Sequence, residues 1–200
     1  MEQEQHIQPF GYAEMFEWKN IPDQLKDNGA GLFVQFSESE PDKIEPYNGG
    51  TICGVTTSSF ASLSDNPIEW PGQYETTETG AYVREKKYIA VGNKVYDQQQ
   101  ELNIVRTFPY KIYKKKQTEE YDARKAPYNM RINRIEWTPV CIQGKCLVRD
   151  DGSCEPGGWC APLEQDDYSN AGIVSAVHPM SDGYYVLKRV SKNVVLILMK

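Results

Sequence analysis

Long apolar runs are missing from this 200-residue sequence. The most apolar stretch, residues 193–199, is far shorter than the roughly 20 residues that a membrane-spanning helix needs. The first ten residues are polar and acidic, without the basic region and apolar run of a secretory signal. We therefore expect a protein that makes no membrane contact and that is made and folds in a cytoplasm.

Positive charge is scarce as well. The formal net charge is -6 and the pI is near 5.1. A protein that binds the phosphate backbone of a nucleic acid needs a large basic surface, so nucleic acid is not expected as a partner.

Histidine is limited to two residues. His6 lies in the polar N-terminal segment and His178 precedes Pro179. No Cys-His or Ser-His catalytic pair follows from this spacing. The glycine pairs at residues 49–50 and 157–158 fit turns better than phosphate-binding loops, because neither opens a helix after a strand with a further glycine. We expect no cofactor.

Cysteine occurs as an odd set of five, and four of them share one C-terminal stretch: Cys141, Cys146, Cys154 and Cys160. The spacing of the first two is at the loose edge of the close pairs that hold structural zinc. A disulfide across the turn between Cys154 and Cys160 is geometrically easy, but a cytoplasmic origin favours free thiols. We expect unpaired buried thiols and no metal ion, with these four cysteines as weak candidates for zinc ligands.

Alternating and β-branched segments predict a mainly β fold, that is, a β-rich α+β fold of antiparallel hairpins with one or two short helices. The helical candidates are Ala13–Lys19 and Ile21–Asn28. Strand patterns occur at Gly31–Phe36, near Ile44, at Gly49–Val55, in a hairpin from Trp137 through Gly144 to Arg149, at Tyr184–Leu187 and at Val194–Leu198.

The domain organisation that we expect is a single domain over residues 1–200, because this length buries a sizeable core. Residues 1–10 form a polar tail. Residues 65–130 read as an inserted excursion: a loop rich in proline and threonine is followed by a stretch of charged residues and tyrosines. Such an excursion can carry partner contacts, although a merely solvated face explains the charges equally well.

Two separated blocks carry a family resemblance. The first is the segment GYAEMFEW, residues 11–18, followed by residues 31–34. The second runs from Ile135 to Cys160 and contains Asp150-Asp151-Gly152; residues 172–174 and 185–187 continue it. Together they resemble the C-terminal autoproteolytic chaperone domain of phage neck appendages and tail spikes, which is of glutamic-peptidase type. The match covers most of the chain outside residues 65 to 130.

The resemblance implies a domain that helps three identical chains to assemble, then cuts the backbone at its own N-terminal edge and leaves the mature spike. Glu14 occupies the position of the family's glutamate. A carboxyl group among aromatic side chains can act as a general base or acid on a nearby peptide, and folding supplies the positioning. Glu17 is a weaker second candidate for this role.

The sequence departs from the family at one position. The resemblance places the scissile bond just before an aspartate three residues ahead of the glutamate, and here that residue is Gly11, preceded by the bulky Phe10. Because the chain starts at Met1, a cut before Gly11 would free only a short peptide. Glu14 then reads as a relic of the ancestral reaction.

The hypothesis from these residues is a virion structural or assembly protein in a tail, spike, fibre or capsid. It keeps the chaperone fold, has lost self-cleavage, and contacts other virion proteins, as a trimer by family resemblance. The alternative is an active autoproteolytic trimerisation chaperone that cuts before Gly11 with Glu14 as its catalytic carboxylate. A plainer interpretation places Glu14 and Glu17 on a short solvated helix and the aromatic residues around them in the core.

Overall fold

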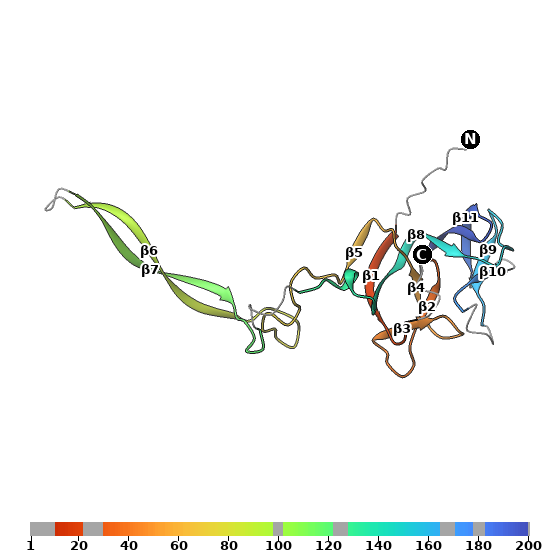
Figure 1. Cartoon of the computed structure of the whole chain (residues 1–200), viewed down its shortest axis with the longest axis horizontal. Helices are drawn as coiled ribbons and strands as arrows, with labels where there is room; N and C mark the ends of the chain where they lie inside the picture. The colour runs from red at the N-terminus through yellow and green to blue at the C-terminus, as the bar shows by residue number, and fades with distance from the viewer. Residues whose placement is uncertain are drawn as a thin grey trace. The chain divides into compact units, whose positions relative to one another are not determined.

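The structure is a computed structural model of the chain that describes residues 11–21, 30–97, 102–121, 128–164, 171–177 and 183–199, with the backbone alone for 89–97 and 102–108. Strands dominate this part of the chain (Figure 1), which confirms the predicted mainly β fold. The elements are β1 (Gly11–Trp18), β2 (Phe33–Phe36), β3 (Lys43–Pro46), β4 (Ile52–Thr56), β5 (Ser62–Ser64), β6 (Arg84–Asp97), β7 (Leu102–Lys115), the 3-10 helix η2 (Arg131–Asn133), β8 (Trp137–Arg149), β9 (Trp159–Pro162), β10 (Val174–Val177), β11 (Tyr184–Ser191) and β12 (Val194–Met199).

The chain divides into two compact units. The first comprises Met1–Ile68 together with Asn129–Lys200, and the second comprises Glu69–Tyr128. The first unit contains a ten-stranded sheet, whereas the described residues of the second form the two-stranded sheet of β6 and β7.

Five strands of the first unit form a ring of hydrogen-bonded neighbours in the order β1, β3, β2, β4 and β8, with β8 pairing back to β1. β1 runs parallel to β3 and antiparallel to β8. Closing a sheet on itself pairs strand edges that would otherwise expose unsatisfied backbone groups.

A second ring shares β8 with the first. The C-terminal part of β8 pairs with β12, and the order continues through β11 and β9 to β10. A parallel bridge between Asp150 and Val174 connects β10 back to the end of β8. β8 therefore belongs to both rings and joins them.

Two hydrophobic clusters fill this unit. Trp18, Val34, Ile44 and Val140 form the smaller one. The larger one is built mainly from the strands of the second ring, and it includes Cys141, the neighbour of Val140. Successive side chains of a strand point to opposite faces, so β8 contributes to both clusters at once. Burial of these apolar surfaces is the main force that holds the unit together.

The segment Trp137–Arg149 is one continuous bent strand, so the predicted hairpin is wrong. Gly144 has a φ of 99°, which disfavours other residues and turns the chain without reversing it. In a straight strand five residues span about 17 Å. The bend brings the Cα atoms of Cys141 and Cys146 within 6.6 Å, and the two cysteines form a disulfide.

The helix predicted at Ala13–Lys19 is also wrong, because this segment is strand β1 up to Trp18. Its flanking strands, β8 on one side and β5 and β3 on the other, impose an extended backbone. Tertiary pairing of this kind overrides the local helix preference of alanine, glutamate and methionine. The other predicted helix, Ile21–Asn28, and the tail at residues 1–10 lie outside the described residues, apart from Ile21.

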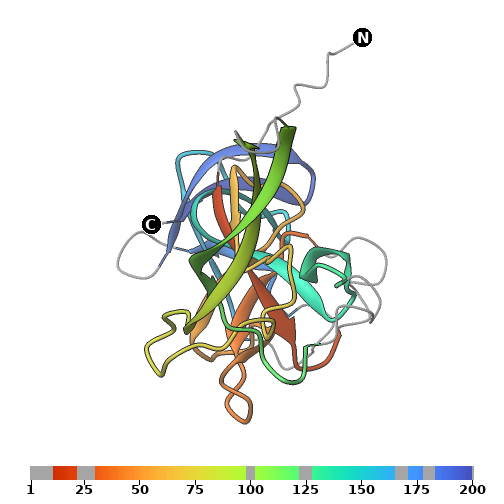
Figure 2. The ribbon, with the colours of Figure 1, turned by 90° about the vertical axis from the view of Figure 1, so that its left-hand side faces the viewer.

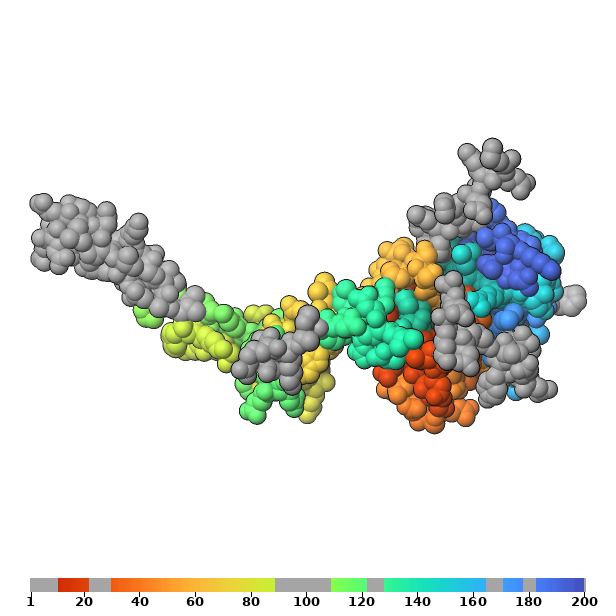
Figure 3. All heavy atoms as spheres, in the orientation of Figure 1, coloured from red at the N-terminus to blue at the C-terminus, as the bar shows by residue number. Residues whose placement is uncertain are grey.

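The second unit is built on the hairpin of β6 and β7, which pair in register from Arg84–Lys115 to Asp97–Leu102. The two strands twist around each other along their length (Figure 2). Near Lys115 the hairpin continues into isolated bridges, Tyr74 with Gln117 and Thr76 with Tyr82. Figure 3 draws the residues of this unit whose side chains are described as yellow and green spheres.

Within the described ranges, no helix is long and apolar enough to cross a membrane.

Asp150, the residue after β8, accepts hydrogen bonds from three other residues. Its side chain is fully buried and accepts hydrogen bonds from the Arg189 guanidinium, at 2.9 and 3.3 Å, and from the backbone N–H groups of Gly152 and Cys154, at 3.1 and 3.3 Å. Arg189 also donates to the carbonyl oxygens of Ser191 and Lys192. One carboxylate thereby connects β8 to β11 and to the turn that follows each strand.

The substitution Asp150→Asn tests these hydrogen bonds. The amide keeps the shape of the carboxylate but loses its charge and part of its acceptor capacity, so we expect the free energy of unfolding to fall by about 2 kcal/mol. Urea denaturation measures the loss. Glu155→Gln makes the same chemical change on an exposed residue and should alter stability by less than about 0.5 kcal/mol. Equal effects of the two substitutions would contradict the role given to Asp150.

Candidate site at the start of strand β1

The candidate catalytic residues lie on β1. Its burial alternates over the first residues, with Ala13 and Met15 almost fully buried on one face and Tyr12 and Glu14 half-buried on the other. The whole strand pairs with β8, while β5 covers the opposite edge at residues 12–14. Glu14 is thus held on a rigid element with strands on both sides.

The Glu14 carboxylate has a hydrogen-bonded neighbour, Tyr12. The Tyr12 hydroxyl lies 2.9 Å from Glu14 Oε1 and 2.6 Å from Ser64 Oγ. A tyrosine has one proton to donate, and an ionised carboxylate only accepts. With Glu14 ionised, Tyr12 donates to Glu14 and accepts a hydrogen bond from Ser64. This chain of three side chains fixes the orientation of Glu14.

Ser64 was missed in the sequence. It reaches Tyr12 because β5 pairs in parallel with β1, with Ser62 opposite Tyr12 and Ser64 opposite Glu14. Nothing in the local pattern of a serine 50 residues downstream indicates such a pairing, since parallel neighbours are set by the fold of the whole unit.

The thiol of Cys53 belongs to the same neighbourhood. Burial raises its pKa to about 12, with a smaller contribution from the negative charge of Glu14. At neutral pH this thiol is therefore protonated, and a protonated thiol is a poor nucleophile. Cys53 does not add a reactive group to the site.

Glu17 does not join Glu14. Residues three apart on a strand point to opposite faces, whereas on the predicted helix they would have shared one. The Glu17 carboxylate lies 3.6 Å from Lys43 Nζ. The pKa of Lys43 is raised, chiefly by its hydrogen bond to Glu40 and then by the charges of Glu40 and Glu17. Glu17 is part of an ion-pair group between β1 and the turn before β3.

Gly11, where the sequence resemblance predicts the family's aspartate, begins β1 opposite Gly144. Its carbonyl oxygen accepts a hydrogen bond of 2.9 Å from the Ala61 N–H. A Cβ atom added to Gly11 would lie 2.5 Å from Cys141 Sγ and 3.2 Å from the carbonyl oxygens of Gln143 and Lys145. Real Cβ atoms do not come so close to another heavy atom, so the site has no room for a side chain here.

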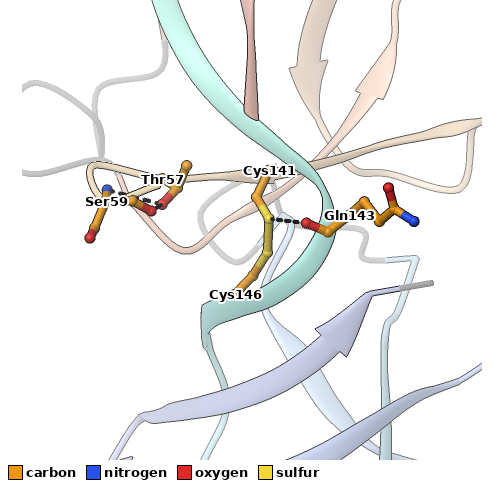
Figure 4. The surroundings of a disulfide bond; sticks show 5 residues. All are labelled: Thr57, Ser59, Cys141, Gln143 and Cys146. Carbon is orange, nitrogen blue, oxygen red and sulfur yellow. Dashed lines mark hydrogen bonds between the residues drawn. A yellow bond between two sulfur atoms is a disulfide. The ribbon is translucent and has the colours of Figure 1, made fainter. Parts of the chain in front are cut away.

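The disulfide between Cys141 and Cys146 creates this obstruction, and it corrects the expectation of free thiols or zinc ligands for these two cysteines. It bridges the bend of β8 (Figure 4). Cys141 Sγ also lies 3.5 Å from the Gln143 carbonyl oxygen, the contact drawn as a dashed line. Because both sulfur atoms are bonded covalently, Cys141 cannot turn away to admit a larger residue at position 11.

Cys154 and Cys160 are free and buried, as expected from the sequence. Burial raises the pKa of both thiols, to about 11 for Cys154. The described residues contain one group with the reach to hold a metal ion, formed by Asp150, Asp151 and Cys154. Asp150 is already bonded to Arg189, and the Cys154 thiol holds its proton, so this group is poorly suited to a cation. His6 and His178 lie outside the described residues.

The substitution Gly11→Ala tests the contact with the disulfide. In the oxidised protein the added methyl group must displace Cys141 or the backbone, and we expect a loss of about 1–3 kcal/mol in the free energy of unfolding. In the Cys141→Ala/Cys146→Ala background the sulfur is gone, so the same substitution should cost less.

Urea denaturation of the four proteins gives both losses. Alkylation of the unfolded, unreduced chain provides the control, since it should modify three of the five cysteines while the disulfide is present. An equal cost in the two backgrounds would show that the disulfide is not what excludes a side chain from position 11.

Two solved structures share the fold of this chain. The chain resembles the crystal structure of the pre-mature bacteriophage phi29 gene product 12, with a TM-score of 0.63 and 20% sequence identity over 97% of this chain and 22% of that one. It also resembles the crystal structure of a C-terminal fragment of bacteriophage phi29 gene product 12, with a TM-score of 0.54 and 21% identity over 94% of this chain and 99% of the fragment.

These likenesses show a shared fold, and the chain spans about a fifth of the length of the first of the two proteins. No curated protein matches the sequence significantly. The sequence profile of one family, described as Peptidase_G2, IMC autoproteolytic cleavage domain, matches residues 5–185, which is most of the chain. The chain therefore belongs to the Peptidase_G2, IMC autoproteolytic cleavage domain family.

Proposed function

We propose that this domain is a structural or assembly component of a phage particle, and that it keeps the chaperone fold of its family without self-cleavage. Membership of an autoproteolytic chaperone family supports the first part. So does the likeness of its fold to bacteriophage phi29 gene product 12 over nearly the whole chain. The site at the start of β1 supports the second part.

The obstruction at Gly11 is the observation that carries the proposal. The family resemblance places a second carboxylate at this position, and in this chain Cys141 Sγ fills the space that even its Cβ would need. The packing of β1 against β8 therefore leaves no space for an aspartate side chain at position 11. The side chain of an aspartate substituted for Gly11 would clash with the Cys141–Cys146 disulfide.

Glu14 also makes a contact that needs no second carboxylate. It lies on the half-buried face of β1, whereas a side chain at position 11 would share the buried face with Ala13 and Met15. Glu14 accepts a hydrogen bond from Tyr12, which suits a structural role.

The partners that we infer are other copies of the chain and other virion proteins. Domains that assist assembly act on oligomers, and the family resemblance points to a trimer. The second unit adds a paired hairpin of 14 residues per strand, which offers a large surface for lasting contacts.

The alternative function is self-cleavage before Gly11 with Glu14 as the catalytic carboxylate. One observation favours it: Glu14 is oriented by Tyr12 and Ser64, as a general base or acid would need to be. A single carboxylate lacks the second acid–base partner that the family uses, so this reaction would depend on Glu14 alone.

Mass spectrometry of purified particles tests the two functions together. Trypsin cuts after lysine and arginine, and the first of these in the sequence is Lys19. If the domain is a virion component without self-cleavage, the particle should yield a tryptic peptide that contains both Phe10 and Gly11. The absence of all peptides of this chain from particles would contradict the structural function.

A tryptic peptide that begins at Gly11 would instead favour self-cleavage. In that case the purified chain carrying Glu14→Gln should keep its Phe10–Gly11 bond, because the amide cannot accept a proton as the carboxylate does. Glu17→Gln is the matched control, as Glu17 points to the other face of β1 and pairs with Lys43.

A further inference from the structure

The hairpin of β6 and β7 lacks the support that a sheet needs. It has two strands, each of 14 residues, and in the described part of the chain no third strand pairs with either of them. A two-stranded hairpin is marginally stable alone in water, and a covered face or further strands are needed for independent stability. The described side chains near its base do not supply an apolar face: Tyr88, Tyr110 and Tyr113 are more than half exposed.

Near the base of the hairpin, the described side chains of one face from Arg84 to Tyr88 and their partners are cations and tyrosines. Alternation along β6 places Arg84, Lys86 and Tyr88 on one face, and the register places Lys115, Tyr113 and Lys111 directly opposite them. We call these six residues the basic face. The side chains of all six are exposed.

Among the described side chains of the hairpin, no acidic residue lies on the basic face. Glu85 lies on the opposite face, where it forms an ion pair of 2.8 Å with Lys87. The contacts described for the basic face are cation-π contacts. Lys86 Nζ lies 5.6 Å from the Tyr88 ring centroid and Lys111 Nζ 5.5 Å from that of Tyr113. Lys115 Nζ lies 3.7 Å from the ring centroid of Tyr82 and 4.9 Å from that of Tyr74.

The base of the basic face adds repulsion. Arg84 lies directly opposite Lys115, and like charges at facing positions destabilise a hairpin. A negatively charged surface laid over this face would relieve that repulsion. Exposed tyrosines beside cations are also typical of protein interfaces, which are enriched in tyrosine and arginine.

The hairpin and the first unit carry net charges of opposite sign. Residues 84–115 contain eight basic and three acidic residues, a net charge of +5. The first unit, Met1–Ile68 with Asn129–Lys200, contains eleven basic and nineteen acidic residues, a net charge of -8. Opposite charges on two parts of one chain favour contact between the hairpin of one copy and the first unit of another.

We propose that the basic face of the β6–β7 hairpin is an interface with a second copy of this chain, in which it lies against the acidic first unit. This inference rests on the proposed homo-oligomer and names the surface that holds it together. The attraction is between exposed charges, so it weakens as salt is added.

The test compares two charge reversals in the full chain. Lys86→Glu/Lys111→Glu changes the basic face, and Lys87→Glu/Lys114→Glu makes the same change in net charge on the opposite face. Sedimentation velocity over a range of protein concentration and ionic strength measures association. We expect the first pair to weaken association by at least about tenfold and the second pair to have little effect. Association of the unaltered chain should also weaken as salt rises.

Circular dichroism of both variants checks that the fold is kept. A monomeric unaltered chain, or association that the two pairs affect equally, overturns the inference. A basic face with tyrosines can also hold single-stranded nucleic acid. If a fluorescent single-stranded oligonucleotide binds the unaltered chain and not Lys86→Glu/Lys111→Glu, while self-association is unchanged, the inference is likewise overturned. These results leave the proposed function untouched, since that is tested by the peptides found in particles.

Discussion

The structure of the first unit depends on one strand that must serve two sheets. β8 closes the first ring through β1 and β4 and opens the second through β12. Its side chains enter both hydrophobic clusters, with Val140 in one and Cys141 in the other. The strand can do this only because Gly144 bends it. The disulfide across the bend then limits how far the two halves of β8 can move apart.

The bend of β8 and its disulfide also determine which residue fits at the start of β1. The bend places Cys141 Sγ against the start of β1, where Gly11 alone fits. Gly11 and the Cys141–Cys146 disulfide therefore depend on each other, because the sulfur of Cys141 fills the space beside Gly11. A change at position 11 is tied to changes in β8, and the two have to be considered together when relatives in this family are compared.

Sequence reasoning predicted the strands whose signal is local. The segments around Phe33, Ile44 and Val195 alternate or are rich in β-branched residues, and they form β2, β3 and β12. It failed at Ala13–Lys19, where helix-forming residues are held extended by three flanking strands. It also failed at Cys141 and Cys146, whose five-residue spacing suits a disulfide only if the strand between them bends.

In the candidate site, too, local features could be predicted from the sequence and long-range contacts could not. The family pattern led to Gly11 and Glu14 as candidates, because their spacing is visible along the chain. Ser64 and Cys141, which touch the two ends of this segment through Tyr12 and Gly11, come from strands far away in sequence. Contacts of this kind follow from sheet register, and a single sequence carries no direct record of register.

The pairing of β1 with β8 has a consequence for synthesis on the ribosome. The β6–β7 hairpin is local and can form within microseconds once Lys115 has emerged. β1 must wait for Gly144, the last residue of β8 with which it pairs, 29 residues further on, which at ordinary elongation rates takes roughly 1–6 s. During that interval both strands of the hairpin have been synthesised, while β1 still lacks its partner in β8. The nascent chain can therefore pair β6 with β7 before it can pair β1 with β8.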